Sequence, residues 1–243
     1  MTSSTTESYL QLLGLAVHEF RTPASVVGGY LRMLQRDAAG ELNERQRKMI
    51  DEAEKSCARL VTLIAEMSDV AKLDSGVIAL ARQPLDIFAL VSEVAEQVQE
   101  ARDREVRLEV RGDDGAAQVN GDATRLRAAF DAIFRAILRE KGGPCVVVAE
   151  RRRETQNGKG TAVVVVSDAA TVQAAYERDR GAFDEKRGGM GLALPLARRV
   201  IEGHGGRITA PAPVPAPDTP PHDPLAADPV SRGSAIITLP LTE

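Results

Sequence analysis

The chain has 243 residues, of which 43% are hydrophobic and 27% charged, and its formal net charge is −4. This composition is that of a globular protein with one large or two small domains, and the slight acidic excess argues against nucleic acid as a main partner. No apolar run approaches the ~20 residues of a membrane helix and no secretion signal is visible, so we expect a cytoplasmic chain without a membrane segment.

Residues 1–78 show the apolar spacing of two long helices, with a predicted capping box of Asn43 and Gln46 at the start of the second. Spacings of three and four alternate in both, which is the seam pattern of packed helices. One hairpin cannot bury both seams, so we expect a homodimer built as a four-helix bundle. The seam residues are Leu10, Leu13, Val17, Phe20, Ala24, Val27, Leu31 and Leu34, then Ile50, Ala53, Cys57, Leu60, Ile64, Met67 and Ala71.

His18 lies one residue off the first seam, beside Glu19 and one helical turn before Thr22. This position holds the imidazole away from the packed face. An exposed imidazole next to a carboxylate suits a side chain that reacts with a molecule arriving from outside.

Over residues 79–243 the period changes to a mixture of strands and helices. We expect an α/β sandwich, with one sheet covered by helices on one face. Residues 210–232 hold 8 of the 13 prolines, which predicts a solvated insertion. Cys57 and Cys145 lack metal-ligand spacing and are predicted to be small buried side chains that form no disulfide. The expected elements are helices after Asp86 and Asp122 and over 191–203, and strands over 106–111, 145–149, 161–166, 207–209 and 235–239, the second and third of them forming a hairpin.

Three segments together resemble the catalytic core of two-component sensor histidine kinases. The run from His18 to Pro23 is similar to the H-box, Gly189 to Leu194 to the second glycine box, and Gly233 to Pro240 to the last strand. The resemblance extends from about residue 7 to residue 243. It implies a dimerising, phosphoacceptor hairpin over 1–78 and an ATPase-type sandwich over 79–243. It also implies ATP and Mg²⁺ as cofactors, and a response-regulator receiver domain as the partner whose aspartate accepts the phosphoryl group.

The resemblance assigns roles to residues in both halves. His18 is the phosphorylated residue, Glu19 orients its ring and takes its proton, and Thr22 corresponds to the residue that positions water for dephosphorylation. In the second half the implied nucleotide-binding residues are Asp168 for the adenine amino group, Arg139 near the phosphates, and Gly189 and Gly191 in the glycine box.

The nucleotide half departs from the family pattern where ATP chemistry is done. Ala132 and Ala136 stand at the positions of two asparagines, the second of which is the family's Mg²⁺ ligand, and a methyl group cannot coordinate a hard cation. Ala170 and Val172 replace two glycines of the first glycine box. Because phosphoryl transfer depends on positioning and on metal neutralising charge, we expect impaired autophosphorylation and predict no metal ligand.

Three interpretations remain open. In the first, the chain is a histidine kinase that still uses ATP, with Asp131 or Glu140 supplying a substitute oxygen. In the second, it is a dimeric histidine phosphotransferase or pseudokinase whose His18 accepts a phosphoryl group from a receiver aspartate or from an upstream kinase or sensor. In the third, it is a non-catalytic dimerisation module.

Overall fold

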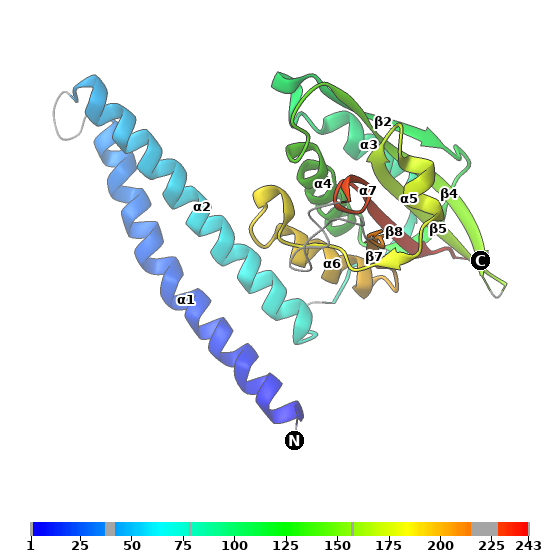
Figure 1. Ribbon diagram of the computed structural model, residues 1–243. Helices are drawn as coiled ribbons and strands as arrows, with labels where there is room; N and C mark the ends of the chain where they lie inside the picture. Colours follow the sequence, from blue (N-terminus) through cyan, green and yellow to red (C-terminus); the bar gives the residue numbers. More distant parts are fainter. Residues whose placement is uncertain (1, 37–41, 78, 157, 215–227, 243) are drawn as a thin grey trace. The chain divides into compact units, whose positions relative to one another are not determined.

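The computed structural model describes residues 2–36, 42–77, 79–156, 158–214 and 228–242. It divides the chain into two compact units, the first ending at Ala79 and the second beginning at Leu80. The predicted order, a helical hairpin followed by an α/β unit, is confirmed (Figure 1). Within the described residues, no helix combines the length and apolar character needed to cross a membrane.

The first unit consists of α1 (Thr2–Gln35), which runs unbroken through Pro23, and α2 (Glu44–Asp74). The capping box is confirmed: Gln46 N donates to Asn43 Oδ1 at 2.9 Å, and Asn43 N donates to Gln46 Oε1 at 3.0 Å. The two helices pack through part of the predicted seams, where Val17, Cys57, Ile64 and Ala71 are buried. Cys57 Sγ donates to the Ala24 carbonyl at 3.2 Å, which ties the helices together at mid-length.

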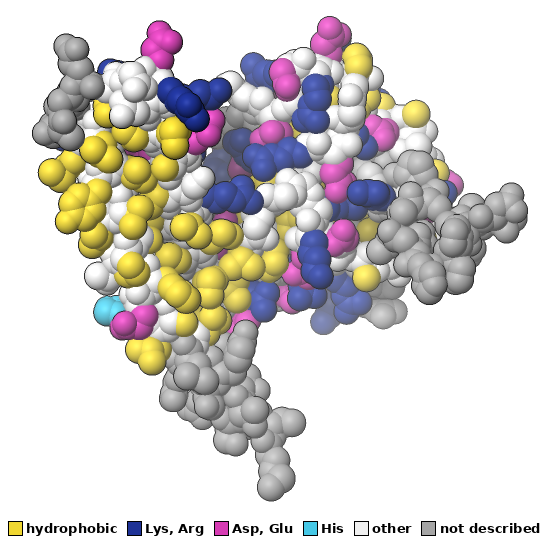
Figure 2. Space-filling view, turned by 60° about the vertical axis from the view of Figure 1, so that its left-hand side comes forward, with side chains coloured by type: hydrophobic (Ala, Val, Ile, Leu, Met, Phe, Trp, Pro, Cys, Tyr) yellow, Lys and Arg dark blue, Asp and Glu magenta, His cyan; other side chains and the backbone are white. Residues whose placement is uncertain are grey.

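Other seam residues remain exposed in the single chain. Phe20, Val27 and Leu60 are 57%, 51% and 55% exposed. Figure 2 shows hydrophobic side chains gathered over this side of the hairpin. Leu10 belongs to the same predicted seam, but its side chain lies outside the described part. The hairpin therefore buries one stripe internally and leaves a second apolar face without a partner.

The second unit is built on a mixed sheet in which β2 and β4 are parallel and all other neighbours are antiparallel. A separate antiparallel pair joins β1 (Gln83–Asp86) to β3 (Gln118–Gly121). The order across the main sheet is β2 (Val106–Gly112), β4 (Cys145–Gln156), β5 (Lys159–Asp168), β8 (Ala235–Pro240), β7 (Arg207–Pro211) and β6 (Arg180–Gly181).

Three longer helices pack on one face of this sheet: α3 (Ile87–Gln97), α4 (Ala123–Arg139) and α6 (Ala193–Gly203). The predicted caps are confirmed, since the side chains of Asp86 and Asp122 accept hydrogen bonds from the first turns of α3 and α4. The fully buried, apolar side of α4 includes Leu126, Phe130, Ile133 and Ile137. The 3-10 turns η1 (Arg102–Arg104) and η2 (Arg187–Gly189) complete this region.

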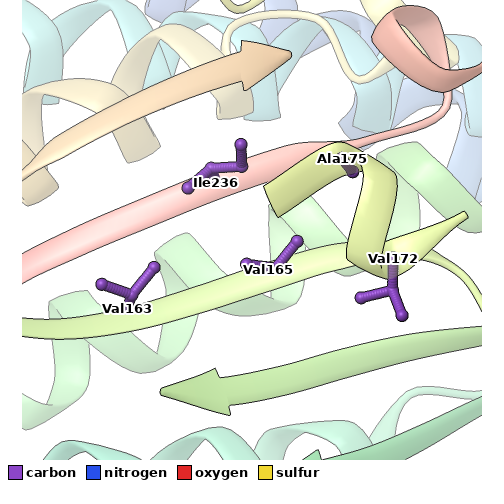
Figure 3. Close-up of a cluster of buried hydrophobic side chains, with 5 residues drawn as sticks. All are labelled: Val163, Val165, Val172, Ala175 and Ile236. Atoms are coloured by element: carbon purple, nitrogen blue, oxygen red, sulfur yellow. The ribbon is translucent and has the colours of Figure 1, made fainter. Parts of the chain in front are cut away.

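The opposite face of the sheet is also covered, contrary to the expectation of helices on one face only. The short helix α5 (Val172–Glu177) places Val172 and Ala175 against Val163, Val165 and Ile236 (Figure 3). Successive strand residues point to opposite faces, so Val164 and Val166 face the side of α4. Both faces of the centre of the sheet are thus buried, which explains the run of four valines, 163–166, in the middle of β5.

The strands of the hairpin are longer than predicted, and β1, β3, α5, β6 and α7 (Pro229–Arg232) were not anticipated. Most of the predicted proline-rich insertion, residues 215–227, lies outside the described residues. Its two described flanks meet at Asp228, whose Oδ2 accepts from Val214 N at 2.9 Å. Both cysteines are free thiols; Cys57 is buried as predicted, whereas Cys145 is only half-buried.

Candidate functional site

His18 is positioned by the hairpin packing on its neighbour Val17. Val17 is 4% exposed, so the next residue along the helix turns outward, and the His18 side chain is 77% exposed. Helical geometry places Thr22 one turn further on, where it is also exposed. The structure therefore presents these two side chains on the accessible surface of α1.

The Glu19 carboxylate lies beside the imidazole, with 3.5 Å between His18 Nδ1 and Glu19 Oε1. The Glu19 side chain is itself 69% exposed. A carboxylate at Nδ1 favours the tautomer that carries its proton there, which leaves Nε2 with a free electron pair. The structure thus places an exposed imidazole and an exposed carboxylate side by side on α1.

The second group of predicted residues lies around the C-terminal end of α4. Asp168, at the end of β5, forms an ion pair with Lys141 just beyond α4, with 2.8 Å between Lys141 Nζ and Asp168 Oδ2. The Lys141 side chain is only 11% exposed, whereas that of Asp168 is 33% exposed. The carboxylate that the resemblance assigns to adenine recognition is thus engaged by a cation of the chain itself.

Ala132 and Ala136 are both buried, at 6% and 0% exposure. The backbone of Gly188 lies directly against the second of them: a methyl group added to Gly188 would lie 2.7 Å from Ala136 Cα and 2.8 Å from its carbonyl oxygen. The segment that leads into the predicted glycine box therefore occupies the space in front of Ala136.

Arg187, the residue before Gly188, is buried in the same region, and its side chain is 2% exposed. Its Nη1 donates to the Ser234 carbonyl at 2.9 Å and its Nη2 donates to the Arg232 carbonyl. Burial lowers the pKa of Arg187, although Glu140 raises it, with 3.9 Å between Arg187 Nε and Glu140 Oε2.

Two other residues of this half that the sequence singled out form local ion pairs. Arg139 pairs with Glu100, with 3.1 Å between its Nε and Oε1 of the glutamate, and Asp131 pairs with Arg135 at 2.8 Å. Gly189 and Gly191 have φ of 59° and 66°. In the part of the chain that the structure covers, no three or more His, Cys, Asp or Glu side chains gather as metal ligands.

Lys141 and Arg187 are the two residues of this region that sequence reasoning missed. Both are basic side chains near motif positions. Lys141 is 27 residues away in the sequence from its partner Asp168, and Arg187 is 47 residues away from Ser234. The only sequence signal is their position, Lys141 directly after the helix that carries the alanines and Arg187 directly before the glycines.

Comparison with protein families matches residues 9–76 to the His Kinase A (phospho-acceptor) domain. The chain is 29% identical over 205 residues to the sensor protein DivL of Caulobacter vibrioides, a match that covers 81% of this chain and 25% of DivL. It is 31% identical over 212 residues to the sensor protein CutS of Streptomyces coelicolor, covering 82% of this chain and 49% of CutS. The chain thus spans about a quarter to a half of the length of these relatives.

Two solved structures share the fold. Full-length ShkA in complex with AMPPNP superposes with a TM-score of 0.67 at 20% identity, covering 96% of this chain and 46% of ShkA. The histidine kinase AdeS of Acinetobacter baumannii gives a TM-score of 0.51 at 15% identity, covering 93% of this chain and 97% of the AdeS structure.

Proposed function

We propose that this chain, which has a two-component histidine kinase core, carries a phosphoryl group on His18 and exchanges it with the aspartate of a response-regulator receiver domain. The phosphoryl group comes from a phosphorylated receiver domain or from a separate kinase rather than from ATP bound to residues 79–243. The contrast between the two candidate regions carries this proposal: the His18 imidazole and its carboxylate are accessible, whereas Asp168 is paired with Lys141 and the Gly188 backbone lies against Ala136.

The proposed transfer needs only groups that the hairpin presents. His18 Nε2 attacks phosphorus, a P–N bond forms, and the P–O bond to the donor carboxylate breaks with its electron pair going to that oxygen. Because Nδ1 keeps its proton, the phosphorylated ring is cationic, and the Glu19 carboxylate stabilises this charge. Thr22 lies one turn away, where it is placed to act on a water that hydrolyses the P–N bond.

The residues of the second unit do not fit Mg²⁺ and ATP. The Asp168 carboxylate is paired with Lys141, and the methyl group of Ala136 offers no oxygen ligand. Arg139 is held by Glu100. Residues 79–243 therefore have a scaffold role in this proposal.

Two copies of the hairpin would form the phosphoacceptor unit. The exposed seam residues Phe20, Val27 and Leu60 supply the apolar face that a second hairpin would bury. The proposed partners are thus a second copy of this chain and a receiver domain.

The test is phosphoryl transfer to the purified chain from a panel of receiver domains carrying radiolabelled aspartyl phosphate. We expect a label on the wild type, lost in acid and kept in base as for a P–N bond, and no label on His18→Gln. Glu19→Gln should lower the rate about 10- to 100-fold, since it removes the orienting charge.

Two parallel incubations decide between the interpretations. Labelling of His18 by γ-labelled ATP and Mg²⁺ in the absence of another kinase would contradict the scaffold role of the second unit. Absence of label from every receiver domain and from added histidine kinases would leave the chain as a dimerisation module without phosphotransfer.

A further inference from the structure

The contact between η2 and α4 is too close to admit a ligand. Gly188 has φ of 63° and lies so near Ala136 that a Cβ at position 188 would overlap the helix backbone. Only glycine satisfies both conditions, because it adopts this conformation without strain and has no Cβ. Since Ala136 is completely buried, the small side chain on the helix and the missing side chain on the turn fit each other.

Arg187 fastens this contact from the next residue along the chain. Its guanidinium donates to two carbonyls at the entrance to β8, those of Arg232 and Ser234, and lies 4.9 Å from the centre of the Phe183 ring. These are charge-assisted hydrogen bonds in a site that excludes water. The side chain thus connects the segment before α6 with the end of α7 and the residue that precedes β8.

A second ion pair holds the same segment to α6. Glu185 Oε1 lies 2.7 Å from Arg198 Nε, and the Glu185 side chain is 20% exposed. Contacts to α4, to α6 and to the segment that leads into β8 therefore converge on residues 183–188, which we call the latch.

We propose that the latch holds the glycine-box segment closed on α4 without a nucleotide, and that Arg187 is the group that keeps it closed. The Gly188 backbone, held by the Arg187 guanidinium, thereby occupies the space in front of Ala136 that a ligand of this unit would need. The inference concerns the second unit alone and does not depend on phosphoryl transfer by His18. It predicts a segment that is closed in the free protein and indifferent to nucleotide.

Hydrogen–deuterium exchange of the full chain, followed by mass spectrometry of peptides over 183–192, tests the latch directly. In the wild type we expect slow exchange that Mg·ATP and Mg·ADP leave unchanged. Arg187→Ala should raise exchange in these peptides about 10- to 100-fold, because two charge-assisted hydrogen bonds are lost, while peptides of β4 and β5 stay protected. Arg187→Lys keeps the charge but not the two-pronged donor, so an intermediate rate is expected.

Two neighbouring glycines provide a matched control if Arg187→Ala destabilises the whole unit. Gly188 and Gly189 both have positive φ, at 63° and 59°, but an added Cβ meets α4 only at Gly188 and nothing within 4 Å at Gly189. Gly188→Ala should open the latch and Gly189→Ala should not. Equal exchange in these two variants, wild-type exchange in Arg187→Ala, or slowing of the wild-type peptides by Mg·ATP would each overturn the proposal.

Failure of the latch and failure of the proposed function give different results. Labelling of His18 by ATP contradicts the scaffold role whatever the exchange rates are. Rapid exchange over 183–192 in the wild type contradicts the latch even where receiver domains label His18 as proposed.

Discussion

His204 is a buried histidine whose hydrogen bonds require one protonation state. Its Nε2 accepts from Asp122 N at 2.9 Å, and its Nδ1 donates to the Val200 carbonyl at 2.6 Å. Burial lowers the pKa of His204 from its ordinary value of 6.5, and Arg82 lowers it further, against the opposing effects of Val200 and Asp122. The neutral ring therefore joins the end of α6 to the start of α4.

This lowered pKa makes the stability of the second unit depend on pH. Between the folded and the unfolded pKa, the unfolded chain binds more protons, so His204 contributes stability that is present above pH 6.5 and is lost as the pH falls through the lower, folded value. We expect a loss of about 1–3 kcal/mol, because the protonated Nε2 can no longer accept from Asp122 N. Urea unfolding followed by circular dichroism at a series of pH values measures it.

His204→Gln is the control for that measurement, since it removes the titrating group. Its stability should be lower at neutral pH and nearly constant across the same window. The lowered pKa of Asp228 has the same sign but acts below its ordinary value of 3.8, in a separate pH range. A wild type whose unfolding free energy does not fall between pH 7 and pH 5 would contradict the assignment.

At the scale of elements, a single helix-capping side chain can satisfy several backbone donors at once. Asp86 Oδ1 accepts from Phe88 N and Ala89 N in the first turn of α3, and also from Ala117 N just before β3. One carboxylate thus begins a helix and positions the chain that returns beside β1.

We expect Asp86→Ala to destabilise the second unit by about 2–3 kcal/mol, which exceeds a typical cap because three backbone donors lose their acceptor. Asp86→Asn keeps an oxygen at this position and should cost less than half as much. Thermal unfolding of the two variants beside the wild type gives the comparison. Equal losses would show that charge, and not the acceptor, is what matters.

The caps also show which parts of the structure a sequence can predict. Asn43, Asp86 and Asp122 were predicted from spacing alone, because a cap and its helix are neighbours in the chain and obey local rules. The accessible position of His18 follows from the seam in the same way. The pairing of Lys141 with Asp168 was not predicted, since the two lie on different elements and no periodic pattern connects them. The placement of α5 on the far face likewise depends on the packing of Val172 against the sheet.

At the scale of the whole molecule, the exposed apolar face of the hairpin is the surface that we expect a second copy to bury. Val26 and Val27 are both 51% exposed on adjacent positions of α1, but only Val27 belongs to the predicted seam. Neighbouring helical residues point about 100° apart, so the two valines lie on different faces of the same helix.

We expect Val27→Glu to weaken the proposed homodimer about 30- to 150-fold, because it places a charge in an apolar interface, and Val26→Glu to leave it nearly unchanged. Sedimentation velocity over a range of protein concentrations measures both. Equal dissociation of the two variants, or a wild type that sediments as a monomer throughout, would rule out the seam as the dimer interface.

The carboxylate of Asp228 has a consequence for how this architecture tolerates change. Because Val214 and Asp228 are joined by a hydrogen bond, and Arg178 pairs with the same carboxylate, the chain leaves and rejoins the sheet region at one point. Because β7 and β8 are also paired directly, a longer connection between them adds closure entropy only slowly. We therefore expect that the connection can be lengthened, shortened or replaced while the sheet and its packing stay unchanged.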